Sequence, residues 1–208
     1  VARMREAIER FEGLPRVGIP AGFRGELRPY QREGLDFLTW TGGLRLGAVL
    51  VDDMGLGKTV QALAWLARLR AEDPKAGPAL VVCPASVVHN WLREAERFAP
   101  ELRVLLPTRG AGRHDLRPAI PEHDLLVTTY ALLRRDLDAW HEVELRAAIL
   151  DEAQNIKNPD AAVAAAARAL RATHRLALTG TPLENRALDL WSIVSFVNPG
   201  YLGSRAEF

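Results

Sequence analysis

Short apolar runs alternate with segments of helical pattern along most of this chain. The runs have few polar residues at alternate positions, and each leads into a turn rich in polar residues or glycine. Strands that are apolar on both faces are typical of a parallel sheet covered on both sides. We therefore predict an α/β fold, a parallel sheet with helices on both faces. The predicted strands are Gly47–Val51, Ala79–Cys83, Leu102–Leu106, Asp124–Thr129, Arg146–Leu150 and His174–Leu178.

Helices are predicted between these strands, where apolar residues recur at helical spacing. Pro29 fits the first turn of one helix, because a missing N–H costs no hydrogen bond there. Ser86 and Asn158 are predicted to cap two other helices with their side-chain oxygens. The predicted helices run from Pro29 to about Trp40, from Thr59 to Leu69, from Ser86 to about Phe98, from Tyr130 to Leu137, from Pro159 onward and from Ala187 to Val197.

The first 25 residues differ from the rest of the chain. Ala2–Phe11 has the pattern of a short amphipathic helix, and Gly13–Gly25 is a connector rich in glycine and proline. Such a connector can mark the boundary with a preceding domain. Residues 26–208 form the predicted domain, and a chain of 208 residues is long enough for a substantial core.

Polar segments follow the predicted strands and should meet at one edge of the sheet. In parallel sheets, ligands bind at the carboxyl ends of the strands. The segments that follow strands are Asp52–Thr59, Ser86, Thr128–Thr129, Asp151–Gln154 and Thr179–Thr181. This shared edge is the predicted functional site.

The segment Met54–Thr59 has the sequence of a phosphate-binding loop between a strand and a helix. Glycines let backbone N–H groups close on phosphate oxygens, and the helix N-terminus favours negative charge. Lys58 would reach the β- and γ-phosphates, and the Thr59 hydroxyl would ligate Mg²⁺. Asp52 departs from the usual pattern, which has glycine at that position. We predict a nucleoside triphosphate site, against the alternative of an ordinary glycine-rich turn.

Asp151 and Glu152 directly follow an apolar strand. Beside a phosphate loop, Asp151 can hold Mg²⁺ through its water shell, and Glu152 can orient or deprotonate the water that attacks the γ-phosphate. Two acids at a helix start would also suit the helix dipole without any chemistry. The phosphate loop favours the catalytic interpretation.

The composition of the chain excludes few classes of function or partner. The net charge of +1 neither requires nor excludes a nucleic-acid partner. Cys83 is the single cysteine and lies in an apolar run, which suits a buried residue in a reducing cytosol. The sequence shows neither a membrane-span pattern nor a signal-peptide pattern, so no membrane partner is expected.

The order of four motifs resembles that of the Swi/Snf-type ATPases, which are double-stranded-DNA translocases and chromatin remodellers of helicase superfamily two. The motifs are Leu27–Gln31, Asp52–Thr59, Asp151–Gln154 and Leu178–Pro182, and the resemblance covers about Leu27 to Gly200. Asp52 is then no objection, because the loop is similar to that family's own version. The resemblance implies a RecA-like first ATPase lobe.

The resemblance also implies roles for individual residues. Lys58, Asp151, Glu152 and Gln154 would be catalytic, with Thr59 and Asp151 serving the metal. The implied nucleotide-binding residues are Gln31, which would read adenine, and Asp53, Met54, Gly55, Leu56, Gly57, Lys58 and Thr59. The implied DNA contacts are Ser86, Thr128 and Thr129, and the implied coupling residues are Thr179, Gly180 and Thr181. Gln154 stands where many relatives have histidine, so a titratable role is lost there.

The implied cofactors are ATP and Mg²⁺, and the implied partners are double-stranded DNA and a second ATPase lobe. We expect an isolated first lobe to be nearly inactive, because the second lobe of such motors supplies arginine fingers. The expected location is cytoplasmic, at the nucleoid in a prokaryote, or nuclear in a eukaryote. Two alternatives are an RNA-directed helicase lobe and a nucleotide-dependent interaction module with little hydrolysis.

Overall fold

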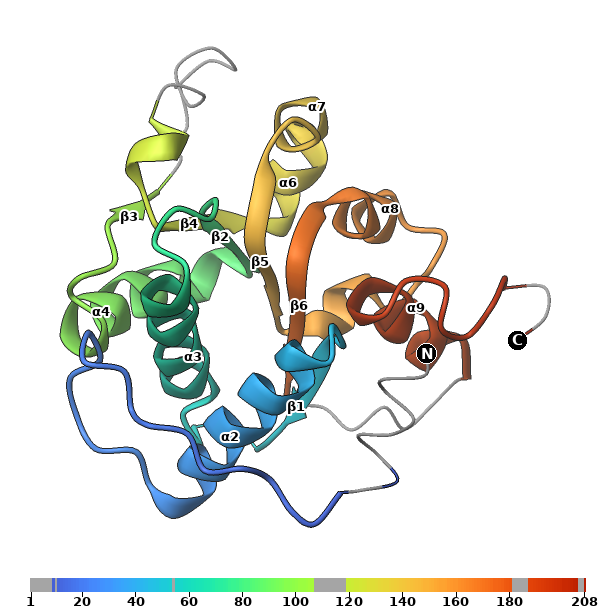
Figure 1. Cartoon of the computed structure of the whole chain (residues 1–208). Helices are drawn as coiled ribbons and strands as arrows, with labels where there is room; N and C mark the ends of the chain where they lie inside the picture. The colour runs from blue at the N-terminus through green and yellow to red at the C-terminus, as the bar shows by residue number, and fades with distance from the viewer. Residues whose placement is uncertain (1–8, 10, 54, 107–118, 181–186, 206–207) are drawn as a thin grey trace.

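The computed structural model describes residues 9, 11–53, 55–106, 119–180, 187–205 and 208. Its six strands form one sheet in the order β1-β6-β5-β2-β4-β3, and every neighbouring pair is parallel (Figure 1). This confirms the predicted parallel sheet. The strands are β1 (Ala48–Val51), β2 (Ala79–Cys83), β3 (Val104–Leu105), β4 (Leu125–Thr129), β5 (Glu144–Asp151) and β6 (Arg171–Thr179).

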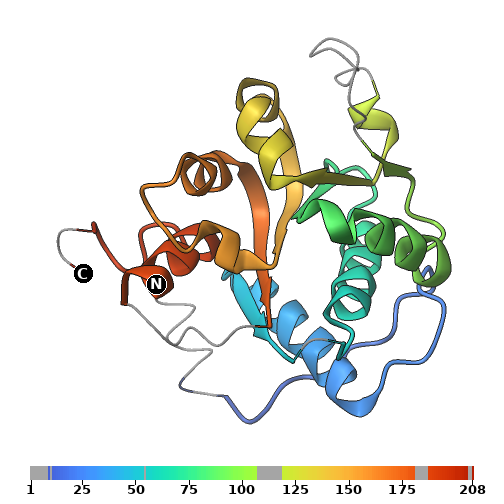
Figure 2. The ribbon, with the colours of Figure 1, turned by 180° about the vertical axis from the view of Figure 1, so that it is seen from behind.

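Helices cover both faces of the sheet, as the reverse view also shows (Figure 2). One layer consists of α2 (Pro29–Gly43), α3 (Lys58–Glu72) and α4 (Val88–Phe98). The other layer consists of α6 (Tyr130–Arg135), α7 (Leu137–Trp140), α8 (Ala162–Ala169) and α9 (Ala187–Val197). Three short 3₁₀ turns complete the described elements: η1 (Ala85–Val87), η2 (Ile120–Glu122) and η3 (Ala153–Ile156).

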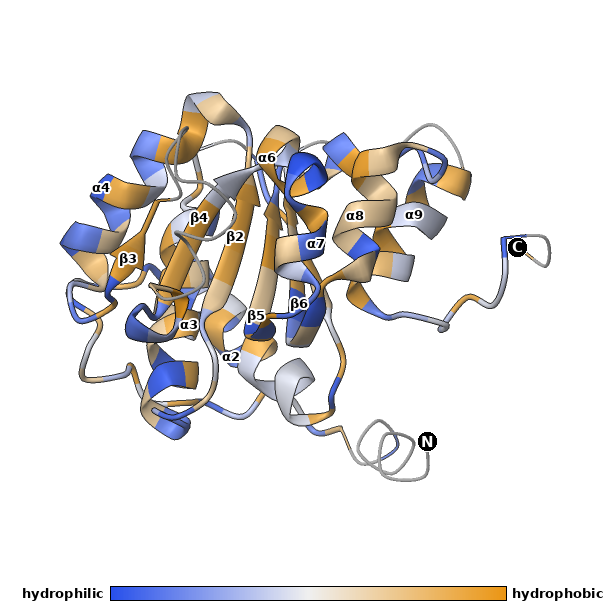
Figure 3. Ribbon diagram, turned by 90° about the horizontal axis from the view of Figure 1, so that it is seen from above, coloured by the Kyte–Doolittle hydropathy of each residue, from blue (hydrophilic) through white to orange (hydrophobic). Residues whose placement is uncertain are grey.

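Strand β2 shows why apolar runs become the centre of this fold. All five of its residues are buried, and successive side chains point to opposite faces of the sheet. Val81 and Cys83 pack with the α2–α4 layer, whereas Leu80 and Val82 pack with the α6–α9 layer. The strands therefore form an apolar band between the two helix layers (Figure 3).

The two predicted side-chain caps are wrong. Ser86 lies inside η1, and α4 begins at Val88 with Val87 at its N-cap. The oxygen Oδ1 of Asn158 accepts from the N–H of Asp160 at 3.0 Å, so its side chain closes a local turn, and α8 begins only at Ala162. Ser and Asn side chains bond equally well within turns, and the sequence pattern does not separate these uses from a cap.

The connector before α2 contributes to the core. Phe23 is buried and stacks on Phe98 of α4, with ring centroids 6.0 Å apart. The predicted helix Ala2–Phe11 lies mostly outside the described residues, and the domain boundary after residue 25 stays a prediction. Within the ranges described here, no helix has both the length and the apolar character needed to cross a bilayer.

Candidate nucleotide-binding and hydrolysis site

The carboxyl ends of the strands bring the predicted segments to one edge of the sheet. Val51 of β1 lies beside Thr179 of β6, and Leu178 of β6 lies beside Asp151 of β5. The phosphate loop, the Thr179 segment and the acidic pair therefore follow three adjacent strands. Predicted residues Met54 and Thr181 lie outside the described part of the chain.

Glycines shape the phosphate loop. Gly55 and Gly57 have φ angles of +85° and +77°, a left-handed conformation in which residues with a Cβ are strained. A Cβ on Gly57 would also lie 2.4 Å from Nε2 of Gln31. Gly57 is the N-cap of α3 and has no side chain to occupy the first N–H groups of that helix. Those groups form the kind of anion site that phosphates use.

Lys58 lies at the first position of α3 and points back into its own loop. Its Nζ donates to the backbone oxygen of Asp52 at 2.6 Å and to that of Asp53 at 3.0 Å. The carboxylate of Asp52 accepts from Nε2 of the buried Gln61 at 3.1 Å. Asp52, which departs from the usual loop pattern, thus connects the end of β1 to α3 and helps to fix the loop.

The carboxylate of Asp151 is buried, and both of its oxygens accept hydrogen bonds. Oδ2 accepts from Nε1 of Trp91 at 2.8 Å, and Oδ1 accepts from the N–H of Glu152 at 3.0 Å. Burial raises the pKa of Asp151 above its ordinary value, and the bond from Trp91 and the charge of Lys58 partly offset that rise. Each carboxylate oxygen keeps a lone pair for a further ligand.

Glu152 has φ +52°, an uncommon value for a residue with a side chain. Its Oε2 accepts from Nε2 of Gln154 at 2.7 Å. The oxygen Oε1 of Gln154 in turn accepts from the hydroxyl of Thr179 at 3.1 Å. The candidate water-activating residue is therefore connected through one amide to the end of β6.

A cavity of about 700 Å³ is lined in part by Gly55 and Gly57 of the phosphate loop. Gln31 is buried at its wall; its Nε2 donates to the backbone oxygen of Leu56 at 3.1 Å, and its Oε1 accepts from the N–H of Arg28 at 3.0 Å. Tyr30 also donates to Leu56 O at 3.0 Å. Toward the residues that the structure describes, the Gln31 amide leaves one N–H and one lone pair unused. Arg93, Arg97 and Phe98 of α4 also line this cavity, and nothing in the sequence pattern marks them as site residues.

The three predicted DNA contacts differ in exposure. Ser86 is exposed, and Thr129 is half-buried with its hydroxyl capping α6 through the N–H of Leu132 at 3.3 Å. Thr128 is 0% exposed within β4, so its side chain does not reach the surface in this structure. The contacts of Ser86, Thr128 and Thr129 with DNA all stay predictions.

The donor set is compatible with Mg²⁺. The described residues contain no cluster of three or more His, Cys, Asp or Glu side chains suited to a metal ion. Mg²⁺ in nucleotide sites uses one or two carboxylates together with waters and substrate phosphates, so it does not need such a cluster. Asp151 and Thr59 carry side-chain oxygens of the type that Mg²⁺ prefers, and their role as ligands stays a prediction.

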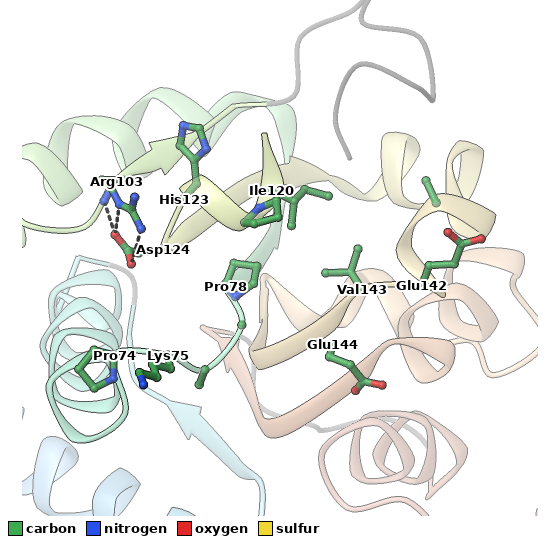
Figure 4. Close-up of a pocket in the computed structure, with 14 residues that line it drawn as sticks. Pro74, Lys75, Pro78, Arg103, Ile120, His123, Asp124, Glu142, Val143 and Glu144 are labelled. Atoms are coloured by element: carbon green, nitrogen blue, oxygen red, sulfur yellow. Dashed lines mark hydrogen bonds and ion pairs between the residues drawn. The ribbon is translucent and has the colours of Figure 1, made fainter. Parts of the chain in front are cut away.

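A second hollow, of about 600 Å³, lies at the opposite edge of the sheet (Figure 4). It is lined by residues that precede β2, β4 and β5, including Pro78, Ile120 and Val143. On its rim Arg103 and Asp124 form an ion pair at 3.0 Å. Because it adjoins the amino ends of the strands, this hollow is separate from the candidate site.

Comparison with known proteins agrees with this geometry. The model of the family described as SNF2-related domain matches residues 30–208. The chain is 42% identical over 200 residues to the putative ATP-dependent helicase/translocase YwqA of Bacillus subtilis, covering 95% of this chain and 22% of that protein. It is 38% identical over 202 residues to the TATA-binding protein-associated factor MOT1 of Saccharomyces cerevisiae, covering 91% of this chain and 11% of that protein.

Solved structures show the same likeness. The SWI2/SNF2 ATPase core of Sulfolobus solfataricus in complex with dsDNA is 41% identical, with a TM-score of 0.85. That match covers 93% of this chain and 40% of the solved chain. The chain thus spans less than half the length of these relatives. Since the family model covers most of the chain and includes the phosphate loop, the acidic pair and the Thr179 segment, the chain belongs to the SNF2-related domain family.

Proposed function

We propose that this chain is the first ATP-binding lobe of an ATP-hydrolysing motor that moves on double-stranded DNA. One observation carries the proposal. Lys58 begins the helix that follows β1. Asp151 ends β5, with Glu152 directly after it, and Thr179 ends β6; these three strands are neighbours in the sheet. The family membership and the likeness to a core solved with dsDNA support it.

Each group of site residues has a separate role in hydrolysis. The N–H groups at the start of α3 and the ammonium of Lys58 bind the phosphates and offset their charge. Thr59 and Asp151 would hold Mg²⁺, which neutralises charge on the β- and γ-phosphates when it is bound. Glu152 orients the attacking water and accepts its proton, and Gln154 fixes the direction of the Glu152 carboxylate.

Adenine recognition belongs to the cavity beside Gln31. The free N–H and lone pair of the Gln31 amide match the acceptor N7 and the donor N6 of adenine. The two bonds that Gln31 makes within the chain hold its amide against the phosphate loop. Helix α2 then binds the base and the adjacent phosphate loop binds the phosphates.

The DNA track is assigned to the segments after β2 and β4, with Ser86 and Thr129 as contacts to backbone phosphates. A second lobe would complete both the duplex track and the ATP cleft. We place the working protein where duplex DNA is, in the cytoplasm at a nucleoid or in a nucleus.

Steady-state ATP turnover of the full-length protein tests the proposal. We expect slow turnover alone and marked stimulation by duplex DNA. Stimulation by RNA but not by DNA would favour an RNA-directed motor instead. ATP binding without turnover under any of these conditions would indicate a nucleotide-dependent interaction module and contradict the proposal.

A further inference from the structure

Two buried aromatic side chains donate hydrogen bonds to the Asp151–Glu152 turn from the helices that follow the candidate DNA-contact segments. We infer that Trp91 and Tyr130 are positioning residues for this acidic pair. Trp91 fixes the carboxylate of Asp151, Tyr130 fixes the backbone of the turn, and both connect it to the DNA-facing side of the lobe. The inference rests on the proposed function and deepens it.

Trp91 makes a bond that packing alone does not require. It is 0% exposed on α4, and its Nε1 lies 2.8 Å from Oδ2 of Asp151. Among the described residues, the indole nitrogens of Trp65, Trp140 and Trp191 are buried without a hydrogen-bond partner. This domain therefore tolerates buried indoles that donate to no described residue. A donated bond to a buried carboxylate selects one orientation of that carboxylate, which a metal-holding group needs.

Tyr130 holds the backbone of the same turn. Its hydroxyl donates to the backbone oxygen of Asp151 at 2.7 Å and lies 3.4 Å from that of Glu152. Burial raises the pKa of Tyr130 well above its ordinary value, and the nearby negative charge of Asp151 adds to the rise, so the hydroxyl remains a donor. The turn needs such support because Glu152 has a left-handed backbone, which costs free energy.

The two helices place these donors between the DNA-facing segments and the acids. Ser86 precedes α4, which carries Trp91, and Thr129 is the N-cap of α6, which begins with Tyr130. A phosphate bound at Ser86 or Thr129 would bias the position of its helix. Each helix is joined to the acidic pair by a hydrogen bond. A shift of either helix would therefore shift the groups proposed to hold metal and water. This gives duplex binding a physical route to hydrolysis.

The Trp91 part is tested with Trp91→Phe in the full-length protein, which removes the N–H donor. Trp140→Phe is the matched control, because it also removes a buried indole but one that donates to no described residue. We expect Trp91→Phe to lower kcat about tenfold or more, and to raise the half-saturating Mg²⁺ concentration by a similar factor, with ATP KM little changed. Equal effects of the two substitutions on kcat and Mg²⁺ dependence would overturn the inference.

A second measurement needs neither turnover nor metal. The indole N–H resonance of Trp91 is assigned through the backbone in nucleotide-free protein, and Asp151→Asn is then compared with the unsubstituted protein. We expect the Trp91 resonance to move and the Trp140 resonance to stay. An unmoved Trp91 resonance would overturn the contact, even if Trp91→Phe does not fold. If the unsubstituted protein has no ATP turnover, the proposed function fails while this measurement still decides the contact.

Tyr130→Phe removes only a hydroxyl, with Tyr201→Phe on the exposed surface as its control. We expect Tyr130→Phe to lower kcat several-fold without changing the Mg²⁺ dependence, because it loosens the turn and leaves the Asp151 carboxylate bonded to Trp91. The ratio of DNA-stimulated to basal turnover should fall in both Trp91→Phe and Tyr130→Phe. Unchanged ratios in both variants would show that the link to the DNA-facing side is absent.

Discussion

The side-chain nitrogen of Gln154 lies 2.7 Å from the Glu152 carboxylate, two residues away in the chain. The other end of the same amide accepts from the hydroxyl of Thr179. An amide cannot lose or gain a proton in the physiological range, so it holds both partners at every working pH.

Gln154→Ala should keep ATP affinity and lower turnover by about tenfold, because it releases the Glu152 carboxylate without touching the phosphate loop. Nucleotide titration and single-turnover hydrolysis in the full-length protein measure the two effects. Asn158→Ala, in a surface turn of the same connection, serves as the control. Normal turnover in Gln154→Ala would show that Glu152 is oriented by other groups.

Lys58→Ala should weaken ATP binding by about 10- to 100-fold or more, because a hydrogen bond to a charged partner contributes roughly 1.5–3 kcal/mol. Titration with a fluorescent ATP analogue measures the change. Lys75→Ala removes a lysine from the opposite edge of the sheet and should bind ATP normally. Unchanged affinity in Lys58→Ala, with the fold intact by circular dichroism, would refute the phosphate-site assignment.

Glu152→Gln separates binding from chemistry. The substitution keeps size and removes the base, so turnover should fall about 10²-fold or more while ATP affinity is retained. Rapid-quench hydrolysis with prebound ATP measures the chemical step. A variant that hydrolyses ATP at the normal rate would exclude Glu152 as the group that activates water.

Gln31→Ala should narrow the preference for ATP over GTP, because a site built to hydrogen-bond the base loses its discriminating amide. Competition binding measures the ratio of the ATP and GTP affinities. An identical ratio in variant and unsubstituted protein would place adenine recognition elsewhere. A general loss of both nucleotides would instead indicate that Gln31 acts by holding the Leu56 oxygen in the loop.

His174 should make the free energy of unfolding depend on pH. Burial lowers its pKa below 6.5, and the charge of Arg45 adds to the effect. As pH falls below 6.5, His174 takes up a proton in the unfolded chain more readily than in the folded chain. The free energy of unfolding is therefore highest above pH 6.5 and decreases as pH falls from 6.5 through the lowered pKa. Urea unfolding at about pH 7.5 and about pH 5.5 measures the loss. His174→Gln should reduce the difference, whereas exposed His89→Gln should not.

The sequence predicted the sheet well because each strand contains an apolar run, although β6 also begins with the polar segment Arg171–Arg175, which was not predicted as strand in full. β2 and α9 match their predicted bounds, and β1 differs from its predicted bounds by one residue. The phosphate loop and the acidic pair could also be predicted from the sequence, since each stands at the carboxyl end of an apolar run. The helix starts predicted from Ser86 and Asn158 are wrong, because local turns use the same side chains as caps.

The supporting contacts of the site were not readable from the sequence. Trp91 looks like any apolar helix residue, and its bond to Asp151 joins residues 60 apart. Tyr130 directly follows the predicted Thr129, but the sequence does not show that its hydroxyl reaches the next strand. Such contacts depend on the order of strands in the sheet, and that order differs from their order in the chain.

The position of β1 at the edge of the sheet has a consequence for how the domain is made. The neighbour of β1 in the sheet is β6, which begins only at Arg171. Asn198 also holds the start of this region, because its side chain accepts a hydrogen bond from the N–H of Gly47 and donates one to the carbonyl oxygen of Gly47. Contacts this distant in sequence form late, since a long loop must close first. A chain leaving the ribosome can therefore assemble β2, β4 and β5 early, but it acquires a firmly held phosphate loop only when nearly the whole lobe has been synthesised.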